Sequence, residues 1–184
     1  MNRMNIATFC AFAMTVAAVY LLNFYPFLPP WAVFITWACF FHMDGGVNRK
    51  QAFISTITHM GLGALGAWLS ALALLNNPFS SQLGSELWGP VLIGAAIAVL
   101  FRMGVFTRFC VTPAIIYGYA SVFAFASTSG FFSFERLTSL SFSNALLGVW
   151  FCIVLGACAG YVNALLVDIL SRLYRYKGRK SLSA

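Results

Sequence analysis

Charge is the scarcest property of this chain. Asp, Glu, Lys and Arg make up 8% of its 184 residues, whereas hydrophobic residues make up 61%. A soluble domain carries roughly 25% charged residues and uses them to cover its surface. The composition therefore argues against an ordinary soluble domain and predicts a protein whose surface is covered by lipid.

Potential metal ligands and catalytic groups are also few. The chain has two histidines and five cysteines, and no two cysteines form a CxxC pair. Zinc sites need clustered thiolates or imidazoles at fixed spacing, so we expect neither a metal site nor another cofactor. A phosphate-binding P-loop, a carboxylate pair and a nucleophile with its base and orienting group are missing as well. We therefore expect no enzymatic activity.

Long apolar runs fill most of the remaining length. A helix rises 1.5 Å per residue and about 20 residues cross the hydrocarbon core, so the longest runs suffice to span it. The second and fourth runs are short. We therefore expect an all-α, polytopic membrane bundle of about six transmembrane helices, forming a single domain over residues 1–184. The six runs cover residues 6–24, 31–43, 52–75, 87–101, 109–127 and 145–170.

Basic residues stand at alternate gaps between these runs. If every run crosses the bilayer, all Lys and Arg residues except Arg136 fall on one side. They are Arg3, Arg49, Lys50, Arg102, Arg108, Arg172, Arg175, Lys177, Arg179 and Lys180. The positive-inside rule makes that side the cytoplasm, so both termini are expected there. Segment 171–184 is then a basic cytoplasmic tail, expected to contact anionic lipid headgroups rather than nucleic acid.

The third run contains an ionisable side chain close to the middle of the membrane. His59 lies about 13 Å into this run at 1.5 Å per residue, and Ser55 precedes it by four residues on the same helical face. Thr56 is three residues before His59. One interpretation is a polar stripe that lines a solute or proton path. The other is a neutral histidine that is hydrogen-bonded to a neighbouring helix.

Glycines in the same run match a nucleotide-binding pattern by spacing alone. Gly61, Gly63 and Gly66 fit G-x-G-x-x-G, but that motif requires a strand before it and a helix that starts at the glycines. Inside a membrane helix, small residues instead allow close packing of helices. Gly156 and Gly160 in the last run form a similar small face.

Two acidic residues lie near predicted cytoplasmic helix ends. Asp44, Gly45 and Gly46 follow the short second run. They could expose backbone groups to a cavity, or they could simply end the helix in a turn. Asp168 precedes Arg172 by four residues, which predicts an interfacial ion pair between these two side chains.

Proline marks the predicted fifth helix. Thr112 and Pro113 stand near the start of its run, and Tyr117 follows four residues after the proline. Proline inside a helix frees a carbonyl group and kinks the axis, which would suit a pore-lining helix. The alternative is a purely structural kink, with the tyrosine anchored near the outer interface.

Several of these features together resemble a known family. Residues 40–46 read Phe-Phe-His-Met-Asp-Gly-Gly, and the glycine-rich run that follows ends with Gly63, Gly66 and Trp68. Thr112 and Pro113 precede a second stretch of small and aromatic residues. The chain resembles, over most of its length, a family of small bacterial inner-membrane proteins that is catalogued only as a numbered domain of unknown function. The resemblance implies a multi-pass protein of the bacterial inner (cytoplasmic) membrane and no particular activity.

These patterns favour a channel or facilitator that passes a small neutral or weakly polar solute. The polar groups expected within the membrane are hydroxyls, one imidazole and an amide, without a charged cluster. We expect a homo-oligomer in the lipid bilayer. The alternative is a non-transporting structural or regulatory subunit of a larger membrane complex. The candidate residues of the solute path are Ser55, Thr56, His59, Thr112, Tyr117, Asp44, Gly45 and Gly46.

Overall fold

The computed structural model is entirely helical in its regular structure over the residues that it describes, which are 3–25, 27–76, 85–106, 111–128 and 132–181. The expected all-α class is confirmed in this part of the chain. Its seven helices are α1 (Arg3–Leu22), α2 (Pro30–His42), α3 (Arg49–Asn76), α4 (Ser85–Phe106), α5 (Thr112–Thr128), α6 (Phe134–Leu137) and α7 (Ala145–Ser181).

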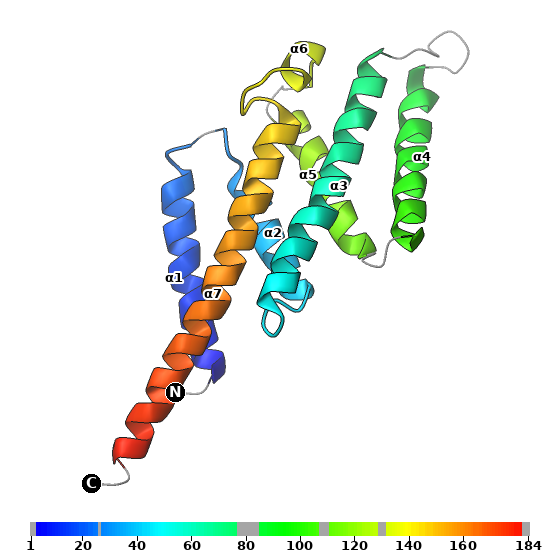
Figure 1. The fold of residues 1–184 in the computed structure, drawn as a ribbon. Coiled ribbons are helices and arrows are strands. Elements are labelled where there is room, and N and C mark those ends of the chain that lie inside the picture. The colour runs from blue at the N-terminus through cyan, green and yellow to red at the C-terminus, as the bar shows by residue number, and fades with distance from the viewer. Residues whose placement is uncertain (1–2, 26, 77–84, 107–110, 129–131, 182–184) are drawn as a thin grey trace.

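Most of these helices are apolar enough to lie in a membrane. Within the described residues, three are long enough to cross it: α1, α3, and α7 over Ala145–Arg175. Helix α2 and the Leu87–Arg102 part of α4 are shorter and also apolar. Helices α1, α2, α3, α4, α5 and α7 alternate in direction along the chain, and the two termini lie at the same end of the molecule (Figure 1). The arrangement indicates a multi-pass helical membrane protein.

Helix α3 stands at the centre of the bundle. It packs most extensively against α5 and also against α7, α4 and α2. A second extensive contact joins α2 to α7. Helix α1 packs mainly on α7, and α4 mainly on α3, so these two helices form the opposite edges of the bundle (Figure 1).

The helix limits differ from the sequence prediction at three places. Helix α7 continues to Ser181 instead of ending near residue 170. Its extension is rich in arginine and lysine, which are good helix formers. Helix α4 extends by several residues beyond the predicted short run 87–101. The predicted loop 127–144 contains the short α6, whose N-cap Ser133 accepts a hydrogen bond from the Arg136 backbone N–H. Residues 109–110 of the predicted fifth run lie outside the described residues.

Glycines bring the backbones of α3 and α5 into direct contact. A Cβ atom added at Gly63 would overlap the backbone carbonyl of Ile115, and one added at Gly118 would overlap that of Met60. The α3–α5 crossing therefore requires glycine on both helices. The sequence interpretation of Gly63 as a packing residue is confirmed.

The α2–α7 contact depends on Gly156 and Gly160 of α7, which are spaced as G-x-x-x-G. A Cβ atom at Gly156 would overlap the Val33 carbonyl oxygen, and one at Gly160 would lie 2.6 Å from the Phe40 ring. Phe40 is completely buried. Without a hydrophobic force between helices in lipid, such close van der Waals contact supplies much of the association energy.

The α3–α5 crossing predicts that two glycine-to-alanine substitutions differ in their effect on stability. Gly118→Ala is expected to lower the free energy of unfolding by about 1–3 kcal/mol, the usual range for overpacking. Gly94→Ala, on α4, is the matched control because nothing lies within 4 Å of its added Cβ. It should leave stability unchanged or raise it by about 0.5–1 kcal/mol. Thermal unfolding in detergent micelles, followed by circular dichroism, measures both; equal stability of the two variants would contradict the crossing.

Candidate functional site

An open groove with a mostly apolar lining runs along the outward face of α3 and includes the polar side chains of Ser55 and Thr58. The groove has a volume of about 640 Å³, and all its described lining residues belong to this helix: Lys50, Gln51, Ile54, Ser55, Thr58, His59 and Leu62. Residues three and four positions apart share one helical face, which explains the spacing of Gln51, Ser55, Thr58 and Leu62. We call this surface the polar groove.

His59 lies at the edge of the polar groove and is held by its own helix. Its Nδ1 is 2.7 Å from the backbone carbonyl oxygen of Ser55. Because a carbonyl oxygen only accepts, Nδ1 carries a proton and donates it to Ser55. The hydroxyls of Ser55 and Thr58 each lie 3.4 Å from the same Nδ1. Within the described residues, the hydrogen-bonding groups around Nδ1 thus belong to α3 itself and not to a neighbouring helix.

Thr56 is separated from the other candidates on α3. Its side chain is fully buried, and its hydroxyl lies beside the Cys39 thiol of α2. Thr56 points about 100° away from Ser55, into the bundle toward α2, and is not part of the groove lining. Thr58 takes the place that the sequence interpretation gave to Thr56. The three-residue spacing from Ser55 was the signal that could have identified it.

The turn after α2 is a helix stop, as the structural alternative proposed. The Gly45 N–H donates to the Phe40 carbonyl and the Asp44 N–H to that of Phe41, each at 3.1 Å. These two bonds form a Schellman motif, with Asp44 in the left-handed conformation at φ 63°. The Asp44 carboxylate accepts a hydrogen bond from the Asn48 amide at 3.3 Å. Asp44, Gly45 and Gly46 do not line the polar groove.

The α5 candidates also lie away from the polar groove. Thr112 is the first residue of α5 and Pro113 the second. Proline in the first turn removes no intrahelical hydrogen bond, so the kink expected at Pro113 is wrong. Tyr117 is on the outward surface of α5, where its side chain is 39% exposed. Of the eight predicted path residues, the structure brings only Ser55 and His59 together.

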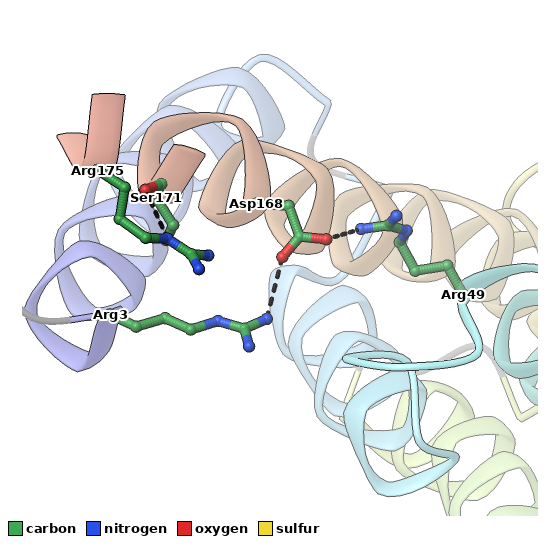
Figure 2. Close-up of polar contacts among 5 residues, drawn as sticks. All are labelled: Arg3, Arg49, Asp168, Ser171 and Arg175. Atoms are coloured by element: carbon green, nitrogen blue, oxygen red, sulfur yellow. Dashed lines mark hydrogen bonds and ion pairs between the residues drawn. The ribbon is translucent and has the colours of Figure 1, made fainter. Parts of the chain in front are cut away.

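A cluster of three charges ties helices α1, α3 and α7 together at the end where the termini lie (Figure 2). Asp168 of α7 accepts a hydrogen bond at 3.0 Å from the Arg3 guanidinium on α1. Its second carboxylate oxygen binds the guanidinium of Arg49 on α3. We call Arg3, Arg49 and Asp168 the ionic cluster.

The ionic cluster corrects the predicted pairing of Asp168 with Arg172. The two contacts of the Asp168 carboxylate are to other helices, and Arg172 acts on it only through longer-range attraction. One turn further on, the Arg175 Nε–H donates to the Ser171 backbone oxygen of its own helix, as Figure 2 also shows. The topology implied by the sequence puts these charges at one end, but the choice of partner depends on how the helices pack.

Comparison with known proteins gives a family but no activity. Residues 4–168 match the family described as "Protein of unknown function (DUF1097)". The chain belongs to this family. The resemblance noted from the sequence is thereby confirmed, and the DUF1097 match extends from α1 to Asp168 of the ionic cluster. No curated protein and no solved structure matches the chain.

The two ion pairs in the ionic cluster of this DUF1097 protein should differ in strength. The side chain of Arg49 is 28% exposed and that of Arg3 is 65% exposed, so water and salt screen the Arg3 pair more strongly. A double-mutant cycle of Arg49→Gln with Asp168→Asn should give a coupling energy of about 1 kcal/mol, and the cycle with Arg3→Gln about 0.3 kcal/mol. Unfolding in detergent at low and high salt measures both; a larger Arg3 coupling would contradict the arrangement.

Proposed function

We propose that this protein is a channel or facilitator for a small neutral or weakly polar solute in the bacterial inner membrane, and that the polar groove forms one wall of the path. The observation that carries the proposal is the groove itself. The groove offers about 640 Å³ of open space, and Ser55 and Thr58 supply hydrogen-bonding groups within its mostly apolar lining, with the buried ring of His59 at its edge.

The depth of these polar groups in the membrane supports their role in the proposed path. His59 lies ten residues after Arg49, or about 15 Å along the helix, which is about half of a 30 Å hydrocarbon core. Polar side chains at this depth normally face a partner or a water-filled cavity rather than lipid. Two hydroxyls and an imidazole can exchange hydrogen bonds with an uncharged solute. Lys50 contributes a charge only at the end of the groove.

The position of the groove supports a homo-oligomer. Its described lining comes from α3 alone, on the outward side of the bundle. A path across the membrane needs a facing wall, and a second copy of the chain supplies one in this proposal. The polar side chains would then be shielded from lipid, which lowers the cost of placing them in the membrane.

The proposed topology has six spans, namely α1, α2, α3, α4, α5 and α7, with both termini in the cytoplasm. The charge pattern supports it, because Arg3, Arg49 and Arg172 all lie at the same end of the proposed bundle. Beyond Asp168, α7 continues to Ser181 as a basic helix. Its cationic side chains are suited to the anionic surface of the cytoplasmic leaflet.

Two engineered cysteines test this topology. Val47, in the turn after α2, is 76% exposed, and Leu140, before α7, is 98% exposed. In the proposed topology, the three spans α3, α4 and α5 lie between these two positions. Because three is an odd number of spans, the two cysteines should face opposite sides of the membrane. In a cysteine-free background, a membrane-impermeant maleimide added to spheroplasts should label Leu140→Cys directly and Val47→Cys only after permeabilisation. Labelling of both from the same side would contradict six spans.

The groove is tested by solute flux into liposomes that contain the purified protein. Thr58→Val removes a groove hydroxyl and should lower the flux of urea or glycerol about ten-fold, since one lost hydrogen bond to the solute costs about 1.4 kcal/mol. His59→Phe should act in the same direction. Stopped-flow light scattering records the rates.

Thr8→Val is the matched control for this experiment. Thr8 on α1 also bonds a backbone carbonyl four residues earlier, at 3.0 Å, as Thr58 does at 2.9 Å. It is outside the groove and should leave the flux unchanged. Equal rates for wild type and Thr58→Val would remove the groove from the path. Absence of any flux, with a partner that co-purifies in fixed ratio, would favour the subunit of a larger complex.

A further inference from the structure

A second groove lies next to the polar groove, between α3 and α7. Its volume is about 520 Å³, and its described lining consists of Lys50, Phe53, Ile54, Cys158, Tyr161 and Val162. Apart from the lysine, these side chains are apolar or aromatic. Lys50 and Ile54 border both grooves. We call the second surface the apolar groove.

The apolar groove has an aromatic floor and faces outward. The rings of Phe53 and Tyr161 meet edge to face, with centroids 6.1 Å apart. Ile54 is 62% exposed and Val162 is 43% exposed, so both contribute walls that are open to the surroundings. In a membrane this surface contacts acyl chains. Cys158 has the smallest of these lining side chains and leaves the groove room on the α7 side.

A cation stands at the end of the apolar groove. Lys50 is the second residue of α3, next to Arg49 of the ionic cluster. Arg49 binds Asp168, whereas none of the ion pairs between described residues involves Lys50. The nearest acidic residue in the sequence, Asp44, accepts a hydrogen bond from Asn48. The lining of the groove contains no carboxylate among the described residues.

We propose that the apolar groove binds one anionic phospholipid of the cytoplasmic leaflet. The ammonium group of Lys50 contacts the lipid phosphate, and an acyl chain lies along Phe53, Tyr161 and Val162. A lysine at the end of a helix extends its ammonium group toward the headgroup level while its stem stays on apolar surface. Basic pockets between helices on the cytoplasmic side suit anionic headgroups. This site is separate from the proposed solute path, and its occupation does not depend on transport.

Native mass spectrometry of the full chain in detergent tests the headgroup contact. Phosphatidylglycerol and phosphatidylcholine with identical acyl chains are titrated in parallel, and the 1:1 adducts are compared. Wild type should prefer phosphatidylglycerol. Lys50→Gln should weaken phosphatidylglycerol binding about five-fold, the effect of one charge near the membrane surface. Lys50→Arg keeps the charge and should keep the preference.

Arg102→Gln is the matched control because it removes a cation from α4, outside the groove and outside the basic tail. It should change phosphatidylglycerol binding less than about two-fold if binding depends on Lys50 rather than on overall charge. Equal losses in Lys50→Gln and Arg102→Gln would overturn the site in favour of diffuse attraction. Loss of the preference in a folded Lys50→Arg would overturn it as well.

A second variant tests the acyl chain independently of charge. Cys158→Phe fills the groove and should lower the adducts of both lipids by a similar factor. Val99→Phe adds a comparable ring at a 58% exposed position of α4 and should leave them unchanged. Unchanged lipid binding in Cys158→Phe would show that no chain occupies the groove. Thermal unfolding of each variant confirms that it is folded before lipid is added.

Discussion

The backbone contact between α3 and α5 determines which side of α3 remains available. Gly63 and Gly118 allow each helix to touch a carbonyl group of the other, so the α3 face that carries Gly63 is turned inward. Met60 and Ala64, both completely buried, lie on this same face. Residues on the opposite face of a helix then point outward. The polar groove is on that opposite face, so its position follows from the helix crossing.

Adjacent residues of α3 have different roles because a helix turns about 100° per residue. Arg49 is directed to Asp168 and holds α3 against α7 and α1. Lys50 is directed away from this cluster and borders both grooves. Two neighbouring cations that look equivalent in a topology argument therefore differ physically. One stabilises the bundle, and the other is placed to contact molecules outside it.

The sequence predicted those features that depend on local pattern. Apolar runs gave the helical class, and the four-residue spacing correctly put Ser55 and His59 on one face. The prediction that Thr56 joins this face was wrong. Thr56 is three residues from His59, but it points about 100° away from Ser55 and into the bundle. The effect of Pro113 depends on where α5 begins, which the apolar run alone does not define. The partners of Asp168 are far away in sequence, so only the packing of α1, α3 and α7 determines them.

The proposed oligomer contact and the proposed lipid site adjoin each other on α3. Ile54 borders both, with the polar groove on one side and the apolar groove against α7 on the other. A second copy that covers the polar groove would bring its own surface up to Ile54 and leave the apolar groove at the edge of the interface. A lipid bound there by Lys50 would contact both copies. Burying its chain against the partner would favour association, because anything that binds only the assembled state stabilises it by mass action.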